Sequence, residues 1–159
     1  MHALETNLLG EINYDDGAVI EFPRGLPGFD ACRRFVAVSL EHTNPLVFLQ
    51  SVEDAALCFT TLPVLAVDPQ YRLSLSGEDR DLVDLPATRQ PIIGREVLCL
   101  AVLSIRETGA TANLLAPVVV NPRNLKAVQA VAQESGYSHQ HVLTAPAVEP
   151  AVEEVAVCS

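Results

Sequence analysis

Apolar and polar residues alternate in a series of short segments along the chain, with Pro and Gly residues between them. A period of two residues is typical of β-strands that place one face against a core. The strands predicted in this way span residues 10–14, 18–23, 34–40, 45–63 (two strands joined by a turn), 71–76 and 112–121. The segment EVLCLAVLSI, residues 96–105, is apolar at nearly every position, which predicts a central strand buried on both faces.

Turn signals join neighbouring strands. The residues DDG at 15–17 predict a hairpin between residues 10–14 and 18–23, and ED at 53–54 predicts a tight turn inside 45–63. One clear helix start follows in SGEDRDLVDL, where Ser76 can act as the N-cap and Asp79 stands three residues later.

Residues 125–133, LKAVQAVAQ, are ambiguous, because Ala favours a helix but the short turn after the preceding strand favours a hairpin. We interpret them as a strand. The pattern as a whole predicts an all-β, mainly antiparallel chain, with a small single-domain β-barrel-like fold and one or two short helices over residues 1–143. Residues 144–159 contain Ala, Val, Pro and Glu without a pattern, which predicts a disordered acidic tail.

Charge limits the partners of this domain. Ten basic and twenty acidic residues give a net charge of -10. Nucleic acids and anionic membranes require clustered Lys and Arg, so direct binding of either is not expected. The acidity suits a basic partner or serves solubility.

The four cysteines lie far apart and form no CxxC motif, and neither an export signal nor an apolar membrane segment is visible. Reduced thiols and a cytoplasmic location are therefore expected.

Candidate chemistry is sparse. His139 and His141 would face one side of a strand and could begin a metal site, but no third ligand stands nearby. A cluster of carboxylates on the predicted helix, which is typical of a solvated face at a helix N-terminus, comprises Glu78, Asp79, Asp81 and Asp84. We expect no enzyme and no cofactor, and a barrel enzyme using the acidic helix or the two histidines remains an alternative.

The stretch FPRGLPGF, residues 22–29, is dense in backbone constraints. Gly25 and Gly28 can adopt positive φ, Pro23 ends a strand, and Pro27 presets a turn. Phe22 and Phe29 are expected to anchor the two ends of this loop in the core. The loop is therefore interpreted as fold-defining.

The stretch NLLAPVVVN, residues 113–121, is interpreted as an edge strand, because Pro117 cannot donate a ladder hydrogen bond. The side chains of Asn113 and Asn121 can bond to nearby backbone in turns. An exposed apolar edge is a docking place for another chain. The alternative is that Pro117 marks a bulge and that the strand is buried on both sides.

These motifs also carry a family resemblance. Together with PLVFLQSVEDAALCF (residues 45–59), LPVLAVDPQY (62–71) and GYSHQHVL (136–143), they resemble the flagellar assembly factor FliW family across residues 10–143. The resemblance implies a cytoplasmic, non-catalytic barrel protein, which we expect to be monomeric. Its implied partners are flagellin and the RNA-binding translational regulator CsrA, which FliW-like proteins antagonise so that flagellin synthesis is coupled to export.

Partner contacts are expected on two of the family motifs, at Pro45, Leu46, Gln50, Asn113, Pro117 and Asn121. The chain departs from the family pattern at Gln140 and Val142, where the family often has Arg and Pro. A small barrel that binds single-stranded nucleic acid is a second alternative function, although the chain lacks a visible basic groove.

Overall fold

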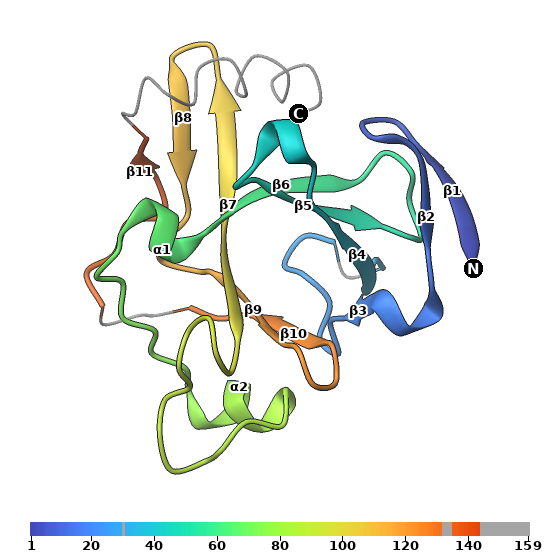
Figure 1. The fold of residues 1–159 in the computed structure, drawn as a ribbon. Coiled ribbons are helices and arrows are strands. Elements are labelled where there is room, and N and C mark those ends of the chain that lie inside the picture. Colours follow the sequence, from blue (N-terminus) through green and yellow to red (C-terminus); the bar gives the residue numbers. More distant parts are fainter. Residues whose placement is uncertain (30, 132–134, 144–159) are drawn as a thin grey trace.

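Seven strands close into a barrel in the computed structural model, which describes residues 1–29, 31–131 and 135–143 (Figure 1). Each strand pairs with the next in the order β3, β4, β5, β6, β7, β9, β10, and β10 returns to β3. All of these pairings are antiparallel except the one between β10 and β3. The bounds are β3 Val19–Glu21, β4 Arg34–Val38, β5 Val47–Ser51, β6 Cys58–Pro63, β7 Leu98–Arg106, β9 Val118–Asn121 and β10 Lys126–Gln129. The all-β barrel prediction is confirmed.

Strand β7 separates two cores. Leu100 packs with Phe35 and Leu49 in one cluster, whereas its neighbours Cys99 and Ala101 pack in a second cluster. Because successive side chains of a strand point to opposite faces, a strand between two cores must be apolar at every position. The first half of β7 confirms the predicted two-sided burial, and its second half is largely half-buried or exposed.

The second half of β7 continues beyond the barrel. It pairs with β8 (Gly109–Ala112), and β8 pairs with the short strand β11 (His141–Val142). A separate hairpin at the N-terminus consists of β1 (His2–Thr6) and β2 (Gly10–Tyr14), and its turn packs against β5 and β6 through Leu8 and Leu9.

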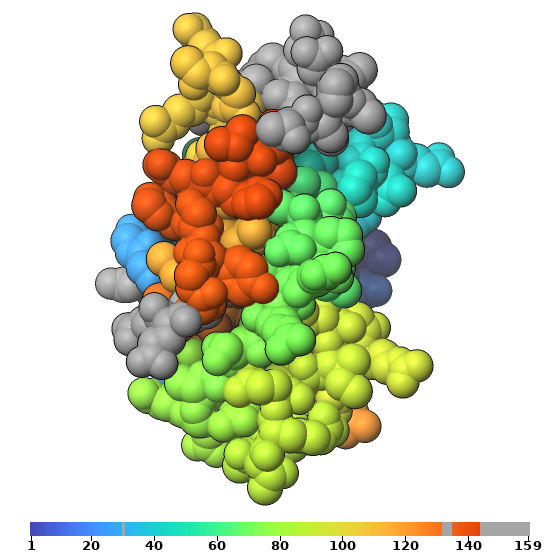
Figure 2. Space-filling model, turned by 90° about the vertical axis from the view of Figure 1, so that its left-hand side faces the viewer, coloured from blue at the N-terminus to red at the C-terminus, as the bar shows by residue number. Residues whose placement is uncertain are grey.

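The second core lies under a long connection between β6 and β7. This connection contains the helices α1 (Val64–Val67) and α2 (Gly77–Leu82). It lies beside residues 135–143 on one face of the molecule, as Figure 2 shows in green to yellow-green and orange-red. The rings of Tyr71 and Tyr137 stack across this contact with centroids 4.4 Å apart. The predicted cap of α2 is confirmed, since the backbone N–H of Asp79 donates to Ser76 Oγ at 3.0 Å.

One hairpin and one strand predicted in the first half of the chain were wrong. Residues 10–14 form no hairpin with residues 18–23, because β2 pairs with β1 and residues Asp16–Ala18 form a 3-10 turn. Residues 71–76 alternate in burial as predicted but form no strand. The side-chain amide of Gln90 instead bonds both backbone groups of Leu75, at 2.7 and 3.0 Å, in the place of a neighbouring strand. For residues 71–76 the alternating pattern therefore predicted the burial of the side chains correctly, but it wrongly predicted that the segment pairs as a strand.

Of the ambiguous stretch 125–133, residues Lys126–Gln129 form β10, so the strand interpretation is confirmed there. The predicted tail 144–159 lies outside the described residues.

Candidate partner-binding site

The loop from Phe22 to Phe29 is a tight double turn. Gly25 has φ 70° and Gly28 has φ 85°, so both occupy the left-handed region that favours glycine. The backbone N–H of Gly25 donates to the Phe22 carbonyl, and that of Phe29 donates to the Leu26 carbonyl, each at 2.8 Å. The predicted glycine conformations are thus present.

The two phenylalanines of this loop behave differently. Phe22 is fully buried and meets Phe35 edge-on, with ring centroids 5.4 Å apart. Phe29, which was expected to be a second core anchor, is 43% exposed. It packs edge-on against Phe59 at 5.4 Å, so one side of its ring covers the barrel and the other side is open to solvent.

An apolar hollow of about 190 Å³ opens beside this ring. Its lining comes from the loop and from four strands: Leu26, Pro27, Phe29, Phe59, Val102, Val118 and Gln129. An exposed aromatic ring beside an apolar hollow is suited to an apolar side chain of a partner protein. Sequence reasoning missed this site, because its residues come from distant strands and only the barrel brings them together.

The PLVFLQ motif places one of its three candidate residues at the surface. Pro45 is exposed and follows a cis peptide bond from Asn44, whereas Leu46 and Gln50 are buried. Gln50 Nε2 lies within hydrogen-bond distance, 3.0–3.4 Å, of four carbonyl oxygens of the β5–β6 turn. Gln50 therefore holds this turn, and its side chain offers no surface to a partner in this conformation.

The NLLAPVVVN motif does not form an edge strand. Residues Val118–Asn121 form β9, which pairs with β7 on one side and β10 on the other, and Pro117 is buried just before it. The edge-strand interpretation was therefore wrong, because Pro117 precedes the strand and needs no ladder partner within it. The alternative is confirmed in that β9 is buried throughout, but Pro117 lies before this strand and does not mark a bulge within it.

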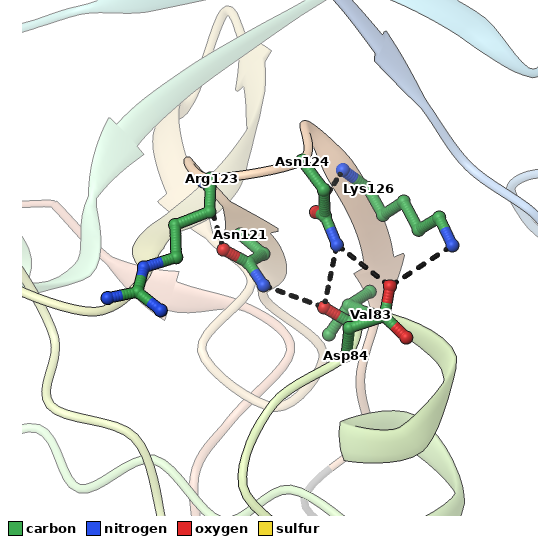
Figure 3. Close-up of polar contacts among 6 residues, drawn as sticks. All are labelled: Val83, Asp84, Asn121, Arg123, Asn124 and Lys126. Carbon is green, nitrogen blue, oxygen red and sulfur yellow. Dashed lines mark hydrogen bonds and ion pairs between the residues drawn. The ribbon is translucent and has the colours of Figure 1, made fainter.

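Both asparagines of this motif bond to backbone, as predicted. Asn113 Oδ1 accepts hydrogen bonds from the N–H groups of Leu115 and Ala116, at 3.1 and 2.9 Å. Asn121 is only 3% exposed, and its Nδ2 donates to the Val83 carbonyl at 2.8 Å (Figure 3). Its Oδ1 accepts from the N–H of Arg123 at 3.0 Å. Asn121 thus joins the end of α2 to the β9–β10 turn.

The acidic helix is tied to the barrel by separate ion pairs. Arg24 of the loop contacts Asp79 at 3.2 Å and Glu78 at 3.4 Å, and Lys126 contacts Asp84 at 3.1 Å. Glu78 and Asp79 thus share Arg24, whereas Asp84 pairs with Lys126, so these carboxylates act as ion-pair partners of the barrel. The two histidines do not lie on one strand as predicted, because His141 begins β11 whereas His139 lies in the turn before it.

In the part of the chain that the structure describes, potential nucleophiles and metal ligands give no further site. Burial raises the pKa of the Cys99 thiol to about 12, so this residue is an unreactive part of the core. Burial also raises the pKa of Tyr71, whose hydroxyl donates to the Leu114 carbonyl at 2.7 Å. Within residues 1–29, 31–131 and 135–143, no three His, Cys, Asp or Glu side chains are close enough together to hold a metal ion. The described helices include none that is long and apolar enough to cross a membrane.

Fold and surface define the class: a small all-β barrel protein with an apolar hollow beside an exposed aromatic residue. The model of the FliW protein family matches residues 3–143, and the chain belongs to this family.

Individual relatives agree with this membership. A flagellar assembly factor FliW of Pseudothermotoga lettingae is 36% identical, with 85% of this chain and 84% of the relative covered. Another of Azoarcus sp. is 34% identical, with 84% and 92% covered. A crystal structure of the flagellar assembly factor FliW superimposes with a TM-score of 0.78 at 27% identity, and the match covers 91% of this chain and 98% of that one. A role in flagellar assembly follows from this membership.

Proposed function

We propose that this protein is a non-catalytic cytoplasmic regulator that binds flagellin and antagonises a CsrA-type translational regulator. Binding to flagellin would leave CsrA free to repress flagellin translation, and release from flagellin would let the protein sequester CsrA. Flagellin synthesis would follow export in this way. Family membership over residues 3–143 is the observation that carries the proposal.

The charge supports the CsrA part of the proposal. An RNA-binding regulator presents basic residues to phosphate, and a partner with a net charge of -10 attracts the same residues. Such long-range attraction acts mainly on the association rate. The exposed helix residue Asp81 offers a place to test it, and Asp81→Lys should slow association and flatten its salt dependence.

Phe29 and the apolar hollow support a protein contact that slows dissociation once a partner has bound. Exposed aromatic residues at the rim of a pocket are frequent binding hot spots, and removal of such a residue costs about 2 kcal/mol or more, mostly through faster dissociation. The hollow beside Phe29 is of a size to take one apolar side chain of a partner protein.

The test is a binding measurement with purified flagellin and purified CsrA by surface plasmon resonance. Wild type is expected to bind both proteins, and Phe29→Ser should bind at least one of them with a dissociation rate increased about 30-fold. Ile92→Ser is the matched control, because Ile92 is also exposed, at 50%, but does not line the hollow. Absence of binding to both partners by folded wild type would refute the proposed function, whereas equal effects of the two variants would refute only the role of the hollow.

A further inference from the structure

A second hollow, of about 280 Å³, gathers an unusual share of the positive charge of this acidic protein. The chain has ten Lys and Arg residues, and three of these line the hollow: Arg89, Arg95 and Arg123. Two carboxylates, Asp84 and Glu96, line it as well. Whether the hollow attracts anions therefore depends on which of these charges are already paired.

Both carboxylates are engaged. Glu96 and Arg89 form a two-pronged ion pair with both N···O distances at 2.6 Å, and Glu96 also accepts the N–H of Ile92 at 2.8 Å. The hydrogen bond from Arg89 is the main reason that the pKa of Glu96 falls to about 2. Asp84 is held by Lys126.

The other two arginines are not paired. Among the described residues, neither the Arg95 nor the Arg123 guanidinium makes an ion pair or a side-chain hydrogen bond. Figure 3 shows the Arg123 side chain extending away from Asp84 and Lys126. The charge of Arg123 contributes to the lowered pKa of Glu96, but among the described residues neither guanidinium has an ion-pair partner of its own, so both can bind an anion.

The backbone that carries Arg123 is fixed. The buried Asn121 accepts the Arg123 N–H and is itself anchored to the Val83 carbonyl, so the β9–β10 turn presents Arg123 from a supported position. Because the backbone of Arg123 is already ordered, binding of an anion costs only the entropy of the side chain.

We propose that this hollow binds a carboxylate carried on a short apolar stem, supplied by an acidic side chain or by the free end of a polypeptide. Guanidinium groups bind carboxylates through two parallel hydrogen bonds. The rest of the lining includes Leu85, Pro86 and Pro122, which suit the aliphatic carbons next to such a group. A monoanion is favoured over phosphate, because the net charge of -10 and the neighbouring Asp84 and Glu96 oppose a ligand with a larger charge. This hollow would bind a negatively charged group, whereas the CsrA-type partner proposed above is basic. The carboxylate site therefore does not depend on the proposed function.

The test is a nuclear magnetic resonance titration of the full chain with four probes. Acetyl-leucyl-glutamate with an amidated end carries only a side-chain carboxylate, and acetyl-leucyl-glutamine with a free end carries only a terminal one. The same glutamine peptide with an amidated end carries no charge, and the fourth probe is inorganic phosphate. The readout is the shift of the backbone and guanidinium signals of Arg95 and Arg123.

At least one carboxylate peptide is expected to saturate these shifts with a dissociation constant on the order of 1–10 mM, a strength typical of a single small contact. The stronger of the two peptides identifies the source of the carboxylate. Arg123→Gln and Arg95→Gln should each weaken binding about fivefold, and Arg106→Gln, an exposed arginine outside the hollow, should leave it unchanged.

Three results would overturn the proposal. These are shifts that do not saturate, binding by the uncharged peptide equal to that of the charged ones, and binding that Arg123→Gln does not weaken. Tighter binding of phosphate than of both carboxylate peptides would overturn the assigned ligand class.

Discussion

Replacement of Asn121 by Ala should unfold the protein at a lower temperature and should not act as a surface mutation. The Asn121 side chain is 3% exposed and joins two segments that are far apart in sequence, at Val83 and Arg123. In Asn121→Ala the Val83 carbonyl keeps only a weak contact, at 3.4 Å, with Asn124 Nδ2. Its buried oxygen then loses most of its hydrogen bonding.

The magnitude follows from these contacts. A buried carbonyl that loses its partner costs about 1–3 kcal/mol, whereas the exposed Arg123 N–H can turn to water and costs little. Loss of the packed side-chain atoms adds roughly 1 kcal/mol. We therefore expect a loss of about 2–4 kcal/mol in the free energy of unfolding, and a melting temperature lower by roughly 5–15 °C.

The assays are thermal melts and urea unfolding, both followed by circular dichroism. Asn113→Ala serves as the comparison, because Asn113 belongs to the same motif but accepts only local turn hydrogen bonds, so its loss should cost about 1 kcal/mol. Asn121→Asp refines the test, since the introduced carboxylate keeps an acceptor for Arg123 but cannot donate to Val83 unless it is protonated. Its deficit relative to wild type should be smaller at pH 4 than at pH 7. An Asn121→Ala variant that unfolds like wild type would refute the structural role assigned to this residue.

Three further predictions concern the loop, the ion pair and nucleic acid. Gly28→Ala should destabilise the fold by about 1 kcal/mol or more, because its φ is 85°, although the added Cβ would meet no atom within 4 Å. Gly17→Ala has equal space and no positive φ, so it should cost less than about 0.5 kcal/mol in the same melts. The Glu96 pKa is about 2 in the folded protein against the ordinary 4.5, so the stabilisation from its pair with Arg89 is complete above pH 4.5 and disappears as the pH falls toward 2. The difference in the free energy of unfolding between wild type and Glu96→Gln should therefore shrink between pH 5 and pH 2.5, and a constant difference would contradict this reasoning. Single-stranded RNA should give no gel shift at physiological salt, because the net charge is -10, and a micromolar shift that weakens steeply with salt would point to a nucleic-acid site.

Much of the barrel could be predicted from the sequence, because period and turn chemistry are local properties. The β5–β6 hairpin, the two-sided burial at the start of β7, the Ser76 cap and the positive φ of Gly25 and Gly28 are all confirmed. Each depends on residues within a few positions of one another, so a single segment carries the whole signal.

Pairing between distant segments could not be predicted in the same way. Leu75 lies in an alternating segment, but the partner of its backbone is the Gln90 side chain. Pro117 suggested an edge, yet the strand that follows it is covered on both sides by residues 98–106 and 126–129. Candidate contacts chosen from family motifs included Gln50 and Asn121, which the fold buries. The choice missed Phe59 and Arg123, because the residues that line the two hollows with them come from distant segments of the chain.

The parallel pairing of β10 with β3 has a consequence for the way in which the chain is made. This contact has a register of one residue pair, Lys126 with Glu21, supported by the Glu21 N–H donating to the Leu125 carbonyl at 2.9 Å. It joins strands separated by about a hundred residues, so the barrel stays open on the ribosome until most of the chain has emerged. During that interval the edge of β3 that later contacts β10 is unpaired. It must then be protected from pairing with strands of neighbouring nascent chains. In the folded protein the β3–β10 contact should be the first contact of the barrel to open. The amide hydrogen of Glu21 should therefore exchange faster than those at the centre of β7.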